Sequence, residues 1–223
     1  MLLLSGPLLL CVLGDLFVMP VLWAGVLIAL SITCYGLNRP AVGVGLGLAA
    51  VFVRELALPY CLLAVGLAWR SGQRRELRWW LLGLAAWGAF YAAHCLRVAE
   101  LIQPGDRAHA HGWVQFGGAA FVLATVQINA YLLLLPQWVA ALCFAAAMCG
   151  FAGWSTPLGL RCGLTVCLYV ITLGAVGQEF NQYWGALVAP LWCFGLARFP
   201  ASLRDLWTAA HWVRIARPQS ASC

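Results

Sequence analysis

Two charged side chains stand next to each other inside an apolar stretch of the sequence. Arg54 and Glu55 occur in "VFVRELALPY", and positions 41–69 hold no other charge. A guanidinium can hold a phosphate through charge-assisted, bidentate hydrogen bonds. A carboxylate, either Glu55 or the earlier Asp15, can accept a proton from an attacking hydroxyl group. These residue types therefore suit reaction at a phosphate ester, with Asp15 or Glu55 as catalytic residue and Arg54 as substrate-binding residue. A structural salt bridge is the alternative.

A second polar group lies late in the chain, in the segment "GQEFNQYWG". It combines the acid Glu179 and the amide Asn181 with the aromatic side chains of Tyr183 and Trp184. Aromatic rings offer an apolar face on which a sugar ring can stack, while amides and carboxylates hydrogen-bond its hydroxyl groups. These four residues are the candidates for binding a sugar. The alternative is an interfacial belt, in which Trp and Tyr sit at the membrane surface beside solvated neighbours.

The segment "DRAHAHGW" raises the question of a metal site. Asp106, His109 and His111 carry side chains that can bind a divalent metal ion. Their spacing matches no specific metal motif, so an exposed loop is the preferred interpretation and metal binding the weaker one. The sequence indicates no other cofactor.

The composition places these groups in a membrane protein. Of 223 residues, 64% are hydrophobic and only 9% are charged, with a mean hydropathy of +0.88. Soluble domains are only about half apolar. Several apolar runs here approach the roughly 20 residues that cross a hydrocarbon core of about 30 Å. We therefore expect a lipid bilayer as partner. The net charge of +6, which comes from Arg with no Lys, indicates membrane orientation and not nucleic-acid binding.

The stretch around Arg54 and Glu55 has an unusual length for a membrane segment. Arginine-rich loops stay in the cytoplasm, and Arg-containing sequences flank this stretch on both sides, at 38–39 and 70–78. The roughly 29 residues between them would make about 43 Å of helix, too long for one upright crossing and too short for two. Two half-length helices that meet at Arg54 and Glu55 satisfy both constraints. Their apex must face a wet or protein-lined cavity, because an unpaired charge in lipid costs about 2.5–3.5 kcal/mol.

The apolar runs predict an all-α, polytopic transmembrane helical bundle with short broken helices and a C-terminal interfacial helix. Residues 1–197 should form about seven or eight membrane segments, and residues 198–223 a cytoplasmic amphipathic tail. One run must not cross if this Arg-rich tail is to lie inside. Residues 116–135, an apolar run with several polar side chains, are the candidate re-entrant segment. The hairpin apex, the loop 97–115 and the segment 177–185 then lie on the external side.

The chain resembles bacterial membrane glycosyltransferases of the GT-C class, multi-pass enzymes related to those that use polyprenyl-phosphate sugars as donors. The resemblance is carried by an apolar run ending in "VFVRELALPY", an apolar return to an Arg cluster, the late "FNQYWG", and "RFPASLRDL" after a final helix. It covers most of the chain and corresponds to the middle and C-terminal part of such an enzyme. It implies a lipid-phosphate-linked sugar as substrate, an external active site and the bacterial inner membrane.

The first external loop departs from the pattern of this class. Enzymes of the class place a catalytic acid in a first large external loop, whereas Asp15 lies in the short segment 14–20. Either Asp15 takes that role in a minimal enzyme, or the chain corresponds to a part of the enzyme that lacks the catalytic loop. We expect the second.

Two other functions are compatible with the same residues. A transporter or flippase for a lipid-linked or anionic solute would use the broken helix as a midplane site, although no internal repeat supports it. A non-catalytic membrane scaffold would leave the polar groups without a specific role. Transfer of a sugar from a lipid phosphate at the external face is the leading expectation.

Overall fold

The computed structural model describes residues 2–103, 106 and 115–215. Within these residues the chain folds into nine α-helices and four short 3-10 helices, and no strand is present. The predicted all-α fold class is therefore confirmed. The elements are α1 (Leu2–Leu10), η1 (Gly14–Val18), α2 (Pro20–Gly36), α3 (Pro40–Val53), η2 (Glu55–Ala57), α4 (Leu58–Arg70), α5 (Arg74–Leu101), α6 (Gly118–Val126), η3 (Leu132–Leu134), α7 (Gln137–Ala152), α8 (Pro157–Ala175), η4 (Glu179–Leu187) and α9 (Ala189–Ile215).

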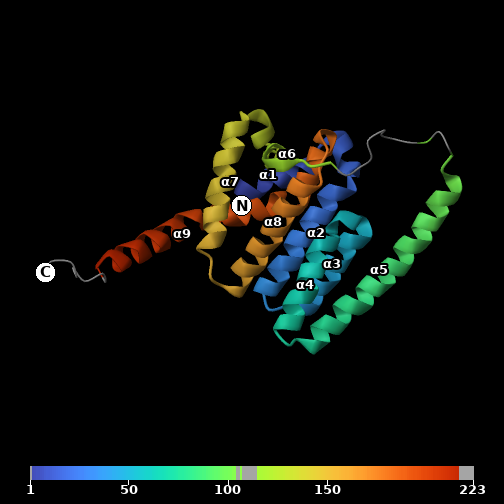
Figure 1. Ribbon diagram of the computed structural model, residues 1–223, viewed down its shortest axis with the longest axis horizontal. Helices are drawn as coiled ribbons and strands as arrows, with labels where there is room; N and C mark the ends of the chain where they lie inside the picture. The colour runs from blue at the N-terminus through green and yellow to red at the C-terminus, as the bar shows by residue number, and fades with distance from the viewer. Residues whose placement is uncertain (1, 104–105, 107–114, 216–223) are drawn as a thin grey trace.

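The helices α2, α3, α4, α7 and α8 lie side by side and form the body of the molecule (Figure 1). Helix α5 packs against α3 and α4 at its start and diverges from the body toward its end. Helix α9 packs on α7 and then extends away on the opposite side. The body is therefore a bundle with one long helix leaning away from each side.

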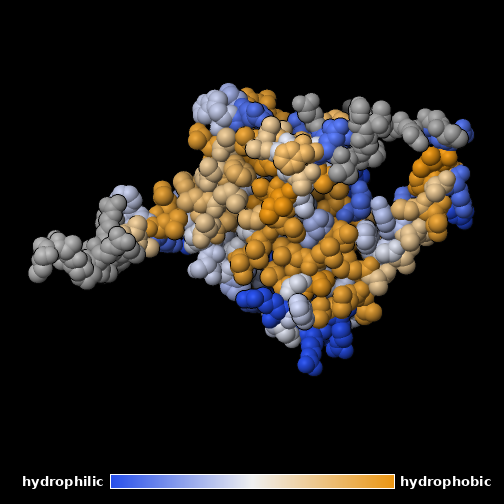
Figure 2. All heavy atoms as spheres, viewed as in Figure 1, coloured by the Kyte–Doolittle hydropathy of each residue, from blue (hydrophilic) through white to orange (hydrophobic). Residues whose placement is uncertain are grey.

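Apolar length supports membrane insertion for only part of the bundle. Two helices are long and apolar enough to cross a membrane, α5 with 28 residues and α8 with 19. A third candidate is the pair Phe180–Leu187 and Ala189–Ala210, which bends by 59° at its junction. Helices α2, α3 and α7 are apolar but shorter. Hydrophobic residues cover much of the visible side of the bundle (Figure 2). The described chain therefore offers two or three candidate spans, and seven or eight membrane segments stay a prediction.

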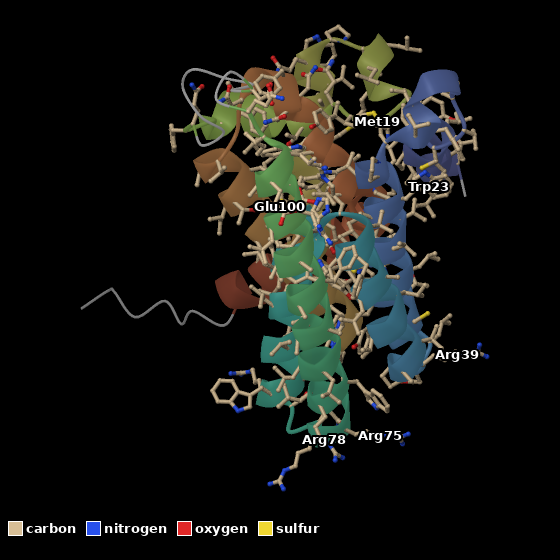
Figure 3. The ribbon with its side chains drawn as sticks, turned by 90° about the vertical axis from the view of Figure 1, so that its right-hand side faces the viewer. Met19, Trp23, Arg39, Arg75, Arg78 and Glu100 are labelled. Carbon is tan, nitrogen blue, oxygen red and sulfur yellow. The ribbon has the colours of Figure 1, made fainter. Side chains whose placement is uncertain are left out.

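The two ends of the bundle differ in charge. Arg39, Arg75 and Arg78 lie at the lower end, whereas Met19 and Trp23 lie in the upper part (Figure 3). The loops that connect α2 to α3, α4 to α5 and α7 to α8 lie at the lower end (Figure 1). We call it the arginine end. Because loops rich in Arg stay in the cytoplasm, this end is expected to be cytoplasmic.

The helix breaks at Arg54, where the sequence analysis expects two half-length helices to meet. Arg54 has extended backbone angles, with φ −150° and ψ 121°. Pro59 has no N–H for the carbonyl of Glu55 four residues earlier, and its ring would clash with that carbonyl in a continuous helix. The hydroxyl of Tyr169 donates a hydrogen bond of 2.8 Å to the free carbonyl of Leu56. Helix α8 therefore holds the break in place.

The run 116–135 contains one short helix and a chain reversal. Helix α6 has 9 residues, about 14 Å at roughly 1.5 Å per residue, which is too short to cross a membrane. After α6, Nε2 of Gln127 donates to the carbonyls of Leu132 at 3.3 Å and Leu135 at 2.9 Å, which stabilises the turn. The chain therefore turns back at the end opposite the arginine end (Figure 1). That this segment is re-entrant in a bilayer remains a prediction.

Helix α9 has 27 residues and continues without a break through positions 197 and 198. The sequence analysis places the change from bundle to amphipathic tail at this point. Pro200 lies inside the helix and does not end it. The first part of α9 is largely buried, and the helix becomes exposed after Ser202. Residues assigned to the bundle and residues assigned to the tail thus belong to one continuous helix.

Helices α7 and α9 approach each other through small residues. A Cβ atom added at Gly150 would collide with the carbonyl oxygen of Gly195, and one at Gly153 would collide with the Ser202 side chain. The hydroxyl of Ser202 donates a hydrogen bond of 2.8 Å to the carbonyl of Gly150. Small residues permit such close backbone contact between helices in membranes.

We expect Gly150→Ala to destabilise the fold, because the added methyl group must push α9 away from α7. The cost should be about 1–3 kcal/mol, as for other overpacked sites. Thermal unfolding in detergent, followed by Trp fluorescence, measures it. Gly45→Ala is the matched control, since nothing lies within 4 Å of its added Cβ and Ala favours helix over Gly. An unchanged midpoint for Gly150→Ala would contradict the close α7–α9 contact.

Candidate functional site

The charged pair at the break, Arg54 and Glu55, forms what we call the apex site. Nε of Arg54 lies 3.5 Å from Oε1 of Glu55, and the two side chains are 29% and 39% exposed. Within the described residues, the buried Nε of Arg54 makes no hydrogen bond. A long contact between sequence neighbours leaves much of the hydrogen-bonding capacity of the guanidinium unused. Arg54 therefore has a counter-charge in Glu55, but most of its N–H donors have no acceptor.

Helix α5 contributes aromatic side chains beside the apex site. The rings of Phe52 and Phe90 lie 5.7 Å apart, which joins the last turn of α3 to α5. Tyr91 lies within electrostatic range of both Arg54 and Glu55, and it stacks on Trp87 with ring centroids 5.1 Å apart and planes inclined by 19°. The sequence analysis does not single out these residues. Trp87 and Tyr91 are four residues apart on one helix, so their side chains share a face. This spacing was the only sign of the aromatic pair in the sequence.

The apex site lies between the two ends of the bundle. Helices α3 and α4 have 14 and 13 residues, so each is about 20 Å long at roughly 1.5 Å per residue. A hairpin of that height stops short of the far side of a hydrocarbon core of about 30 Å. A charged pair at this depth is partly exposed and close to aromatic rings, which is an arrangement able to hold an anionic group. Carboxylate and phosphate groups are both held by Arg through two parallel N–H donors.

The sugar-site candidates of the sequence lie on η4, which packs against α2 and α6. Asn181 is fully buried, and neither its Oδ1 nor its Nδ2 has a hydrogen-bond partner in the described chain. Trp184 is also buried, with an unpartnered Nε1, and its ring contacts that of Tyr183 edge-on at 6.4 Å. An unpaired buried amide costs about 1–3 kcal/mol. Asn181 is therefore a group that would gain from a bound polar molecule.

Close backbone contacts explain why η4 is buried. A Cβ atom at Gly185 would collide with the carbonyl oxygen of Thr125 in α6, and one at Gly25 in α2 would collide with that of Ala186. Glycine at these positions lets η4 fit between the two helices. Asn181 and Trp184 thus lie in the bundle interior, whereas Phe180 and Gln182 of the same segment are exposed.

The structure does not bring all the predicted site residues into contact. Arg54 and Glu55 form one pair, and Asn181, Tyr183 and Trp184 form a second group. Within the described residues, no hydrogen bond or ion pair joins the two groups. The other two predicted residues lie on short helices, and their side chains are outside the description: Asp15 on η1 and Glu179 on η4.

Of the three residues predicted as a weak metal site, the structure describes only Asp106. Asp106 is exposed, and its Oδ2 accepts a hydrogen bond of 2.8 Å from the backbone N–H of Gln103. His109 and His111 lie outside the described residues. Among the residues that are described, no group of three His, Cys, Asp or Glu side chains could hold a metal ion. A metal at this segment stays a prediction.

A second polar network, which the sequence analysis missed, lies near the arginine end. Nη2 of Arg161 is 3.7 Å from Oε1 of Glu76, and the side chains are 11% and 12% exposed. The hydroxyl of Tyr35 donates to the same carboxylate oxygen at 2.6 Å and accepts from Nε1 of Trp80 at 3.2 Å. The guanidinium of Arg161 lies 3.6 Å above the ring of Tyr35. We call these four residues the anchor network, because they tie α2, α5 and α8 together.

Comparison of the chain with known protein families, with characterised proteins and with solved structures finds no match. Its function is therefore argued from the side chains themselves.

We expect the apex site to be reachable from the side of the membrane opposite the arginine end. In a chain whose exposed Cys95 and other reactive thiols are replaced by Ser, Glu55→Cys should react with an impermeant maleimide from one side only. Arg74→Cys, at the start of α5, should react from the other side. Labelling of sealed, oriented vesicles measures both. Reaction of the two cysteines from the same side would contradict an external apex site.

The anchor network should dominate stability among the charged residues. Glu76→Gln leaves the buried charge of Arg161 without its counter-charge, which costs about 3–5 kcal/mol at buried pairs. Thermal unfolding in detergent should show a large loss for this variant. Replacing both Glu76 and Arg161 by Leu should cost less than the sum of the single changes.

Arg97→Gln is the matched control for this experiment. It breaks the exposed pair of Arg97 with Glu100, whose atoms are 3.2 Å apart, and such pairs contribute only about 0–1 kcal/mol. Equal losses for Glu76→Gln and Arg97→Gln would show that the anchor network is not a buried constraint.

Proposed function

We propose that this protein is a membrane glycosyltransferase, or part of one, that transfers a sugar from a lipid-phosphate donor at the face opposite the arginine end. The observation that carries the proposal is the state of Arg54. Its guanidinium lies at a helix break, is partly exposed at 29%, and has a single ion-pair contact at 3.5 Å within the described residues. Such a group is suited to a phosphate that approaches at membrane depth.

The donor phosphate would bind to Arg54. As the bond between the sugar and the phosphate breaks, the electron pair of that bond goes to the phosphate, and negative charge builds on it. Positively charged donors that are already in place stabilise this charge in the transition state. The resemblance to GT-C enzymes supports the same assignment, because it implies a polyprenyl-phosphate sugar. The bacterial inner membrane follows from that resemblance and is part of the proposal.

A carboxylate would activate the acceptor. The acceptor hydroxyl loses its proton to Glu55, or to Asp15, while its oxygen forms the new bond to the sugar carbon. Glu55 is the better candidate within the described side chains, since it lies beside Arg54 and is 39% exposed. Asp15 stays a candidate through its place on η1, at the end of the bundle opposite the arginine end.

The sugar would contact aromatic and amide side chains. Asn181 supports this role because both polar atoms of its buried amide are unpartnered in the described chain. Tyr183, Trp184 and Glu179 are neighbours of Asn181 on η4. Since Asn181 and Trp184 are buried, sugar binding there requires η4 to move relative to α2 and α6. The stacked rings of half-buried Trp87 and exposed Tyr91 offer an alternative surface for the sugar.

The decisive variant is Arg54→Ala, assayed by transfer of radiolabelled sugar from polyprenyl phosphate in membranes that contain the full reading frame. Losing one phosphate contact should raise the barrier by about 2–4 kcal/mol, a rate loss of roughly 30- to 1000-fold. Arg54→Lys should recover only part of the rate, because an ammonium cannot form the bidentate contact. Arg78→Ala, an exposed arginine of the opposite end, is the matched control and should keep full activity.

Each result of this assay has a separate meaning. Full transfer by a normally folded Arg54→Ala variant would make Arg54 a structural charge and exclude it from the donor site. If wild-type membranes transfer no sugar from any lipid phosphate but move a lipid-linked anion across the bilayer, the protein is a transporter, for which a broken helix with charges at its apex is equally suited. If they do neither, the scaffold interpretation holds.

A further inference from the structure

A cavity of about 740 Å³ opens at the arginine end, far from the apex site in the bundle. Its walls come from the end of α2, the end of α4 and the beginning of α8 together with the loop before it. These are the elements that the anchor network and the hairpin hold together. A cavity of this volume falls in the range of small-molecule sites, roughly 300–1,000 Å³.

Two guanidinium groups line this cavity, those of Arg70 and Arg161. Arg70 is exposed and forms no ion pair within the described residues. Arg161 is largely buried, and its Nη2 pairs with Glu76. Its Nη1 is buried as well. Arg70 is therefore the guanidinium that is open to a ligand, and Arg161 adds positive charge beside it.

Neutral hydrogen-bonding groups complete this polar wall. Asn38, Ser71 and Thr156 line the same cavity. The Oγ1 atom of Thr156 accepts a hydrogen bond of 3.1 Å from the N–H of Gly159, so its own O–H remains able to donate. The first turn of α8, with Pro157 at its start, also lines the cavity and adds the positive end of a 19-residue helix. All these groups favour an anion with several acceptor oxygens.

The opposite wall is apolar. It is formed by side chains of Leu67, Leu158 and Leu160 together with Trp154. Leu160 is exposed on the outer surface of α8, so the cavity continues toward the side of the bundle that faces lipid. A free inorganic anion would gain nothing from such a wall, whereas the glycerol and first acyl carbons of a lipid would be buried against it.

We propose that this cavity binds the phosphate headgroup of an anionic lipid from the leaflet at the arginine end. Arg70 holds the phosphate, Arg161 adds positive charge beside it, and the leucine side chains hold the beginning of the acyl chains. Basic pockets between membrane helices on the cytoplasmic side are suited to lipid headgroups in this way. The neighbouring charges favour an anion as well, since Arg39, Arg74, Arg75 and Arg78 lie around the same end and Glu76 is already engaged by Arg161 and Tyr35. This site does not depend on the proposed sugar transfer.

The probes are short-chain phosphatidic acid, short-chain phosphatidylcholine and inorganic phosphate, each titrated into the purified full chain in detergent. Binding is read by native mass spectrometry and by the shift of the unfolding midpoint, because a ligand of the folded state stabilises it. Phosphatidic acid should bind and stabilise. Phosphatidylcholine, which has no net charge, and inorganic phosphate, which lacks acyl chains, should each bind at least about ten-fold more weakly.

The test variant is Arg70→Gln, and the matched control is Arg74→Gln. Both remove one exposed arginine from the same end, but only Arg70 lines the cavity. Arg70→Gln should weaken phosphatidic acid binding about ten-fold, as expected for one charge-assisted contact, whereas Arg74→Gln should change it less than about two-fold. Arg70 has no ion-pair partner in the described residues, so its loss leaves the fold intact even where Arg161→Gln does not.

Three results would overturn the proposal. Equal effects of Arg70→Gln and Arg74→Gln would show that lipid is attracted by diffuse surface charge and not by this cavity. Inorganic phosphate that binds as tightly as phosphatidic acid, and depends on Arg70, would make the ligand a free phosphate. Failure of phosphatidic acid to bind the wild-type chain would remove the site altogether.

Discussion

A guanidinium inside an apolar bundle costs several kcal/mol unless the protein supplies its partners. Arg161 receives them from two other helices, the Glu76 carboxylate of α5 and the Tyr35 ring of α2. These helices cannot separate from α8 at the arginine end without exposing an unpaired charge to lipid. The far end of α5 has no such tie, and its apolar side chains there, such as Leu96 and Leu101, are exposed. The contacts of Arg161 with Glu76 and Tyr35 therefore hold three helices together at the arginine end. The other end of α5 diverges from the bundle (Figure 1).

The divergence of α5 determines what the apex site faces. Near the break, α5 touches the hairpin through Phe90 and Phe52, and beyond that point its side chains are exposed. The partly exposed pair of Arg54 and Glu55 therefore lies beside a helix that covers it loosely. The proposed donor, carried on a polyprenyl chain, would move within the bilayer and reach its site sideways. A charged pair next to a loosely packed helix is compatible with that route, whereas a site enclosed by the bundle would not be.

Local features of the sequence predicted the break at Arg54, since a charged pair, Pro59 and the length of the apolar stretch all act within a few residues. The anchor network could not be found this way. Glu76 stands in a run of arginines and Arg161 in an apolar run, and only the packing of α5 on the body brings them together. The sequence also could not predict the burial of Asn181, because that burial depends on glycine contacts between η4, α2 and α6. The sequence analysis placed the start of the amphipathic tail at residue 198, within what the structure shows as the single helix α9.

The pairing of Arg54 with Glu55 places a constraint on the proposed reaction. Their side chains are 3.5 Å apart. The two residues cannot remain paired while one holds the leaving phosphate and the other takes the proton of the acceptor. A donor phosphodiester carries one negative charge on two non-bridging oxygens, as a carboxylate does, so it can replace Glu55 as the partner of Arg54. Binding of the donor would then release Glu55 to act as the base, so that the acceptor is activated only when the donor is in place.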